Sequence, residues 1–129
     1  MKKFFWTMVL LACLVGSCRL GMSWSDDHEA MEGPGIRVIR LEGEIIDGRK
    51  WIEKLRKAMD DSAVKAVVLR IESPGGAVGA SQEIYAAVRE LDKTKPVVAS
   101  IGNIGASGGY YAALGARRIW ALPGSITGS

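Results

Sequence analysis

Ser107 is the residue whose surroundings are best suited to chemistry. It stands between Gly105 and the pair Gly108 and Gly109, where an apolar run gives way to an alanine-rich helical pattern. Glycine lets the backbone approach a substrate carbonyl closely, and a serine that begins a helix has unpaired N–H groups beside it that bind an oxyanion. We therefore predict that Ser107 is a nucleophile. The alternative is a helix N-cap, a position at which serine is also favoured.

A second turn of small residues, Ser-Pro-Gly-Gly at 73–76, follows a nearly continuous apolar stretch at 64–71. Such a stretch is typical of a strand that is covered on both faces. The Ser107 turn follows the next predicted strand, at 96–101. Because ligands bind in the crevice outside the carboxyl ends of parallel strands, we expect the two turns to lie side by side.

Acyl transfer needs an attacking hydroxyl group and N–H donors for the oxygen that becomes negative. The Ser107 turn offers the hydroxyl group, and the natural donors are Gly75 or Gly76 on one side and the Gly108 N–H group on the other. The alternative for residues 73–76 is an ordinary turn, since proline and glycine are common in turns.

Hydrophobic periodicity and turn residues predict alternating strands and helices. Strands are expected at residues 36–41, 44–46, 64–71, 96–101 and 118–122, and helices at 48–60, 79–91 and from the Ser107 turn to about 116. The first two strands suggest a hairpin, and Ser81 is a possible cap of the second helix. The order β-α-β-α-β predicts an α/β fold with a mostly parallel sheet and right-handed crossovers. Residues 123–129 are expected to be a Gly/Ser turn without a closing strand.

Residues 1–24 have the pattern of a membrane-targeting helix. Lys2 and Lys3 precede an apolar run at 4–15. We expect a retained signal anchor; a cleaved signal peptide and lipidation at Cys18 are the alternatives. Basic residues ahead of the run predict that the domain lies on the extracytoplasmic side of the membrane. Residues 25–35 have the composition of a linker.

Composition and motif spacing exclude several classes of function. Lys2, Lys3 and Arg19 account for the whole net charge of +3, so no basic patch for nucleic acid is expected on the domain. The glycine spacing matches neither a dinucleotide-binding loop nor a phosphate loop. Both cysteines and the single histidine, His28, precede the domain, so we expect no metal site, no cofactor and no histidine base in it.

Ser107 therefore needs a different general base, and lysine is the usual substitute. Each lysine of the domain has a more ordinary explanation, on a solvated helix face, at a strand start or at a helix C-terminus. These lysines are Lys50, Lys54, Lys57, Lys65, Lys93 and Lys95. We predict that the base lies beyond Ser129 and that the chain as given is inactive.

Three ordered stretches carry a resemblance to a known family. They are residues 69–76, 102–112 and 123–129, and the serine stretch with its paired tyrosines is the most specific. Residues 36–129 resemble signal peptide peptidase A, the membrane-anchored serine peptidase of bacteria. The resemblance implies a fold similar to the Clp protease and crotonase superfamily, built of β-β-α units. Residues 36–129 would then be the N-terminal part of a truncated peptidase domain.

By this resemblance, Ser107 takes the place of the family's nucleophile, and Gly75 and Gly76 match the turn that lines its oxyanion hole. The family's base is a lysine in a later Ser-Gly-x-x-Lys type motif, so this chain would hold half of a Ser/Lys dyad. Family members form dome-like homo-oligomeric rings, in some of which the neighbouring subunit supplies the lysine. The implied substrates are signal peptides or other hydrophobic peptides at the bacterial cytoplasmic membrane. Gly105 stands where alanine is common, which would loosen the turn.

Two other functions fit the same residues. A crotonase-like acyl-CoA enzyme would use the glycine turns to hold a thioester enolate, and a non-catalytic exported pseudo-peptidase or scaffold would lack the lysine. We expect the peptidase, because the export signal and the lack of an evident CoA-binding basic cluster count against the acyl-CoA enzyme.

Overall fold

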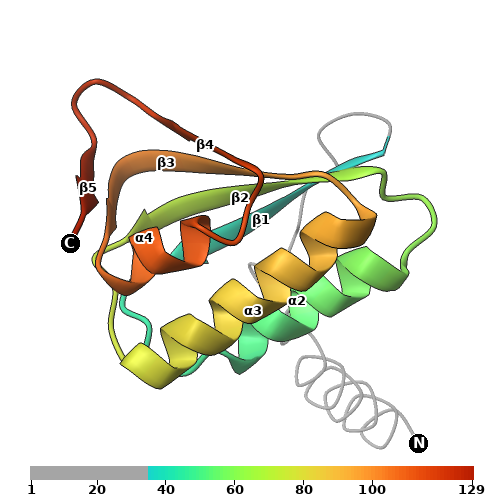
Figure 1. Cartoon of the computed structure of the whole chain (residues 1–129), viewed down its shortest axis with the longest axis horizontal. Helices are drawn as coiled ribbons and strands as arrows, with labels where there is room; N and C mark the ends of the chain where they lie inside the picture. The colour runs from blue at the N-terminus through green and yellow to red at the C-terminus, as the bar shows by residue number, and fades with distance from the viewer. Residues whose placement is uncertain (1–34) are drawn as a thin grey trace, which may run out of the picture.

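The computed structural model describes residues 35–129, which Figure 1 shows in colour. Residues 1–34 lie outside the described part. They contain the targeting segment expected at 1–24, with Cys18, and all of the linker expected at 25–35 except its last residue. Within the described part, no helix is long and apolar enough to cross a membrane.

A five-stranded parallel sheet forms the centre of the fold. The strands are β1 (Ile36–Glu42), β2 (Ala66–Ser73), β3 (Val97–Ala106), β4 (Arg118–Ala121) and β5 (Ile126–Gly128), and the helices are α2 (Arg49–Asp60), α3 (Val78–Thr94) and α4 (Gly108–Ala113). The order in the sheet is β1-β2-β3-β4, and β5 pairs with the far end of β3. This topology confirms the α/β fold with a mostly parallel sheet.

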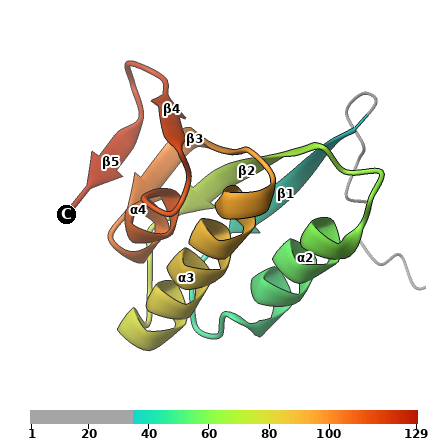
Figure 2. The same cartoon turned by 45° about the vertical axis from the view of Figure 1, so that its right-hand side comes forward.

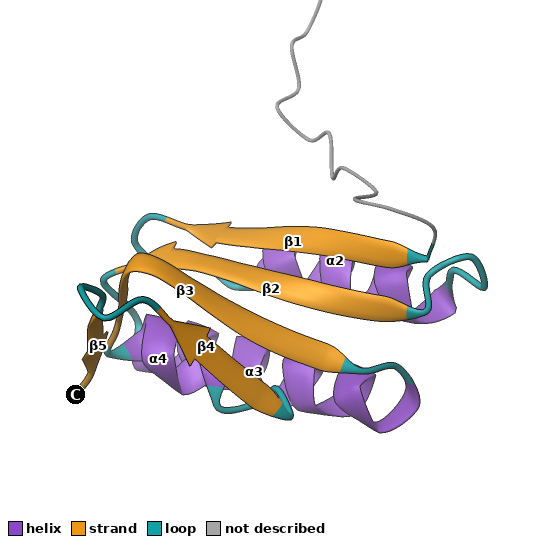
Figure 3. Ribbon diagram, turned by 90° about the horizontal axis from the view of Figure 1, so that it is seen from above, coloured by secondary structure: helices purple, strands orange, loops and turns teal. Residues whose placement is uncertain are grey.

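The three helices pack on one face of the sheet. Figure 2 shows α2 and α3 side by side, with α4 beside α3 under β3, and Figure 3 shows the opposite face with no described element over it. Alternate residues of the strands point toward the helices, as the period of two requires. Leu69 of β2 and Ala99 of β3 lie in one row of this face and belong to the same core cluster as Ile84 and Val88 of α3, and all four are fully buried.

The predicted hairpin is wrong. Residues 36–42 pair with β2 in parallel, not with the segment around Ile45. Ile45 instead continues alongside the exit of β2, where it forms a single parallel bridge with Gly76. The side chain of Ile45 is fully buried, so its hydrophobicity reflects a place in the core and not a second strand of a hairpin.

Two further expectations are corrected. Ser81 is not a cap, because α3 begins at Val78 and the Ser81 hydroxyl group, one turn into the helix, donates to the carbonyl oxygen of the N-cap residue Ala77 (2.9 Å). Residues 123–129 are not only a turn, since Ile126–Gly128 form β5. The sequence does not predict this strand, because its three residues, between Ser125 and Ser129, carry too short a pattern to indicate one.

Candidate active site

Ser107 lies at the junction between β3 and α4, with its side chain exposed. It occupies the N-cap position, since its carbonyl oxygen accepts a hydrogen bond from Tyr111 N–H (2.9 Å). Its hydroxyl group, however, makes no capping hydrogen bond. The backbone torsions are φ 49° and ψ −123°, in a region that non-glycine residues rarely adopt. A strained strand-to-helix turn of this kind projects a serine hydroxyl group outward.

The turn after β2 is held by Ser73, whose side chain is fully buried. The Ser73 hydroxyl group donates to the carbonyl oxygen of Gly43 (2.6 Å) and accepts from Gly75 N–H (3.1 Å). Gly75 has a φ of 98°, in the left-handed region that favours glycine. The Gly75 N–H group is therefore already paired, whereas among residues 35–129 nothing accepts a hydrogen bond from Gly76 N–H.

The two glycine turns are in direct contact, as the sequence predicts. A Cβ atom on Gly75 would lie 2.6 Å from the Gly108 nitrogen and 2.7 Å from Ser107 Cβ. A Cβ atom on Gly109 would lie 2.8 Å from the carbonyl oxygen of Ser73. Side chains at these glycines would push the turns apart, so the small residues are what allow the contact.

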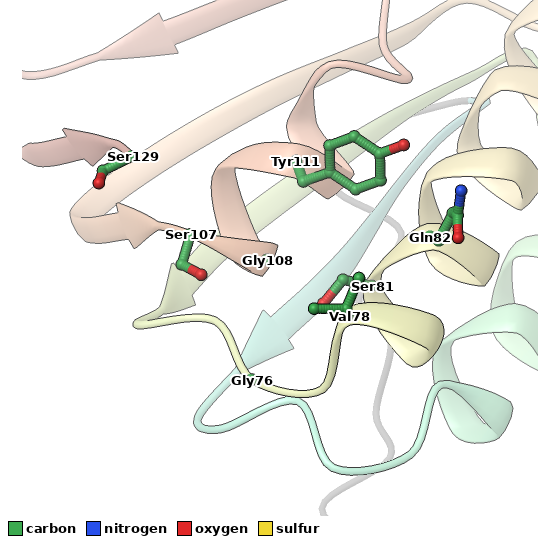
Figure 4. Close-up of a pocket in the computed structure, with 8 residues that line it drawn as sticks. All are labelled: Gly76, Val78, Ser81, Gln82, Ser107, Gly108, Tyr111 and Ser129. Atoms are coloured by element: carbon green, nitrogen blue, oxygen red, sulfur yellow. The ribbon is translucent and has the colours of Figure 1, made fainter.

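A cavity of about 280 Å³ opens beside Ser107. It is lined by Gly76, Val78, Ser81, Gln82, Ser107, Gly108, Tyr111 and Ser129. In Figure 4 the Ser107 side chain points toward the glycine turn, and residues of α3 together with Tyr111 of α4 form the other side. Val78 is 80% exposed and presents its apolar side chain at this cavity.

Tyr111 is held in place by a second tyrosine. Its ring stacks on that of Tyr85 in α3, with 5.0 Å between the centroids and 27° between the planes. Arg89 donates a hydrogen bond to the Tyr85 hydroxyl group (3.1 Å). The wall of the cavity that Tyr111 forms is thus supported from behind by α3.

An irregularity in the pairing of β2 and β3 precedes Ser107. Ile71 of β2 pairs with Ile101 of β3, but Ser73 pairs with Gly105. The stretch of β3 between these pairs is therefore longer than the matching stretch of β2. The Glu72 carboxylate accepts a hydrogen bond from Asn103 N–H (2.9 Å) in this longer stretch and is paired with Arg70 (3.0 Å). Glu72 thus satisfies a backbone group that the sheet leaves unpaired.

The far end of β3 is held by β5. Ser107 N–H donates to the carbonyl oxygen of Gly128 (2.8 Å). Gly105 pairs with Ser73 on one side and with Thr127 on the other, so this glycine lies between two paired strands. The pairing of β3 with β5 continues to Ala106, the residue before Ser107.

No lysine within residues 35–129 lines the cavity beside Ser107. Lys95, for example, donates to the carbonyl oxygens of Ala58 (2.8 Å) and Asp61 (2.6 Å) at the end of α2. Over the same residues, no group of three or more histidine, cysteine, aspartate or glutamate side chains is placed to hold a metal ion.

Some lining residues were not expected at the cavity from the sequence. Ser81, Gln82 and Tyr111 meet at the cavity because α3 and α4 pack together, and helical spacing alone does not reveal this. Ser73 was included only as part of a turn. Its position immediately before proline and two glycines was the available signal.

Known proteins share both the sequence and the fold of this part of the chain. Residues 89–129 match the profile of Peptidase family S49. Protease 4 of Haemophilus influenzae is 45% identical over 104 residues, which cover 73% of this chain and 17% of that protein. The chloroplastic serine protease SPPA of Arabidopsis thaliana is 36% identical over 116 residues, covering 85% of this chain and 17% of the relative.

These matches support peptidase family S49 as the family of this chain. Its similarity to proteins named SPPA supports the resemblance found in the sequence. The chain spans less than a fifth of the length of these two relatives. A crystal structure of an enoyl-CoA hydratase/isomerase family member superimposes with a TM-score of 0.60 at 17% identity, covering 69% of this chain and 45% of that one. This likeness confirms the crotonase-like fold.

Proposed function

We propose that the full-length protein is a serine endopeptidase in which Ser107 is the nucleophile. The observation that carries the proposal is the contact between the Ser107 turn and the glycine turn, which brings an exposed hydroxyl group next to two N–H groups that make no hydrogen bond within residues 35–129. Those donors are Gly76 and Gly108. The names of the two relatives, which are called proteases, support the same reaction.

The reaction would proceed through an acyl-enzyme. The Ser107 Oγ atom attacks the carbonyl carbon of a peptide bond, and its proton passes to a general base. The carbonyl oxygen becomes an oxyanion that accepts hydrogen bonds from Gly76 N–H and Gly108 N–H. Collapse of the tetrahedral intermediate breaks the C–N bond, and the amine leaves with a proton from the base. Water then hydrolyses the ester at Ser107.

The general base is proposed to be a lysine outside residues 1–129, as the resemblance to signal peptide peptidase A implies. A neutral lysine amine has the required chemistry when burial lowers its pKa. Without it, the chain as given would be inactive. Assembly into a homo-oligomeric ring is part of this proposal, since a neighbouring subunit is one source of the base.

The proposed substrates are signal peptides and other hydrophobic peptides at the cytoplasmic membrane, with the catalytic domain on the extracytoplasmic side. Val78 and Tyr111 give the cavity beside Ser107 apolar surface, which suits an apolar side chain of a bound peptide. Peptide hydrolysis needs no cofactor in this scheme.

The crotonase-like fold favours one rival function, an acyl-CoA enzyme, and a single comparison tests both. The full-length protein is incubated separately with a synthetic signal peptide and with a medium-chain acyl-CoA. We expect cleavage of the peptide and no turnover of the thioester. Thioester turnover without peptide cleavage would replace the peptidase with the acyl-CoA enzyme, and no reaction with either would favour a non-catalytic scaffold.

A further inference from the structure

Ser73 joins three segments of backbone at the edge of the cavity. Its hydroxyl group binds Gly43, at the end of β1, and Gly75, in the glycine turn, while Ser73 itself is the last residue of β2. The other buried polar side chain within residues 35–129, Ser81, bonds only to its own helix. The two buried serines therefore have different structural roles.

The peptide group between Gly75 and Gly76 is fixed on one side by Ile45. The Ile45 N–H group donates to the carbonyl oxygen of Gly75 (2.8 Å), and Ala77 N–H donates to the carbonyl oxygen of Ile45 (2.6 Å). In a trans peptide, the carbonyl oxygen and the following N–H group point in opposite directions. Since the Gly75 oxygen faces Ile45, the Gly76 N–H group points away from it, and Gly76 lines the cavity beside Ser107.

Ser73 fixes the preceding peptide group. Its oxygen accepts the Gly75 N–H bond, and Gly75 adopts a positive φ. Two consecutive glycines have much conformational freedom, so a turn built on them keeps one orientation only when its backbone groups are bound. Ser73 and Ile45 together bind both polar groups of Gly75.

We propose that Ser73 is a positioning residue, whose buried hydroxyl group orients the glycine turn so that Gly76 N–H faces the oxyanion formed at Ser107. This inference rests on the proposed peptidase function. Ser73 touches neither the substrate nor the reacting atoms. It acts through Gly75, and its effect is felt in the transition state, when the negative charge develops.

The test compares three variants of the full-length protein on one signal-peptide substrate. Ser73→Ala removes the hydroxyl group, and Ser73→Cys keeps a side chain of similar size with a weak hydrogen-bonding atom. Ser100→Ala is the matched control, because Ser100 is a half-buried serine on the open face of the sheet that accepts a hydrogen bond from Arg70 (3.0 Å). Thermal unfolding of each variant establishes that it is folded.

We expect kcat to fall roughly 10- to 100-fold in Ser73→Ala, with KM changed less than about threefold, because a misdirected donor affects the transition state more than substrate binding. Ser73→Cys should likewise lower kcat with little change in KM, and Ser100→Ala should keep the wild-type kcat. Binding of a peptide aldehyde, which forms a tetrahedral adduct at a serine, should weaken in parallel with kcat.

A folded Ser73→Ala or Ser73→Cys protein with wild-type kcat would overturn the inference. If Ser73→Ala does not fold, the Ser73→Cys protein gives the result alone. Loss of kcat without weaker aldehyde binding would also overturn it, because such a loss would reflect general disruption. Failure of the peptidase proposal is distinguishable, since Ser107→Ala would then cleave the peptide at the wild-type rate.

Discussion

The backbone nitrogen of Gly108 lies 2.6 Å from the point that a Cβ atom of Gly75 would occupy. Gly75 follows β2 and Gly108 begins α4, so this contact joins the turns after two neighbouring strands. Because of this contact, Ser107 and Gly76 line the same cavity. In the proposed peptidase, the contact therefore assembles the nucleophile and the oxyanion donors.

Gly75→Ala should disrupt this contact. Alanine at a φ of 98° is strained by about 1–2 kcal/mol, and its methyl group would also push against Gly108 and Ser107. We expect the free energy of unfolding to fall by about 2 kcal/mol or more, and peptidase activity to fall at least about 100-fold. Urea unfolding and peptide hydrolysis measure the two effects.

Gly79→Ala is the matched control for this variant. Gly79 lies near the start of α3, and a Cβ atom there meets no atom within 4 Å. Because alanine favours helix over glycine, the control should be as stable as the wild type or more stable by about 0.5–1 kcal/mol. Equal stability of Gly75→Ala and Gly79→Ala would contradict the contact described above.

Ser107→Gly should relieve backbone strain. Glycine accommodates the observed φ of 49° and ψ of −123°, whereas alanine at the same place keeps the strain of serine. We expect Ser107→Gly to be more stable than Ser107→Ala by about 1 kcal/mol, the reverse of the order in a helix interior. Denaturant unfolding of the two variants makes the comparison, and a more stable Ser107→Ala would show that the turn is not strained.

Asp92 should make stability depend on pH. Partial burial raises the pKa of its carboxyl group, but hydrogen bonds from Val97 N–H (2.8 Å) and Arg117 (2.8 Å) outweigh burial and hold the pKa below its usual value of 3.8. A carboxyl group whose pKa is lowered by folding stabilises the protein above its usual pKa, and this contribution is lost as the pH falls through the lower, folded-state pKa.

Asp92→Asn should therefore lower the free energy of unfolding by about 1 kcal/mol at pH 7, and the gap from the wild type should narrow as the pH falls below the usual pKa. Urea unfolding at several pH values measures the gap. Asp60→Asn, at an exposed position in α2, is the control and should change little. A gap that stays constant down to acid pH would contradict this assignment.

Much of the fold is predictable because the main elements carry strong local patterns. Residues 64–71 are apolar almost throughout, and they form most of β2. Trp51, Leu55 and their apolar neighbours recur at the spacing of one helix face. This spacing predicts α2 to within one residue of its observed bounds. The hairpin failed because Ile45 packs into the core through contacts with the later glycine turn, and local sequence does not show which distant segment an apolar residue meets.

The candidate site was predictable to a similar degree. Parallel topology alone was enough to expect the turns at Gly75 and Ser107 to meet. The sequence does not show which of Gly75 and Gly76 keeps a free N–H group within residues 35–129. This depends on the Ser73 hydroxyl group, which accepts the hydrogen bond from Gly75 N–H. The cavity wall at Tyr111 likewise depends on its stacking with Tyr85, a contact between two helices.

The most direct test of the account is the reaction of the full-length protein and its Ser107→Ala variant with a hydrophobic peptide ester, followed by rapid acid quenching and mass spectrometry. We predict that the wild type carries the acyl group on Ser107 and that the variant has lost at least about a thousandfold in kcat, as expected when a nucleophile is removed. Wild-type hydrolysis by Ser107→Ala, or an acyl group on a different residue, would contradict the central claim.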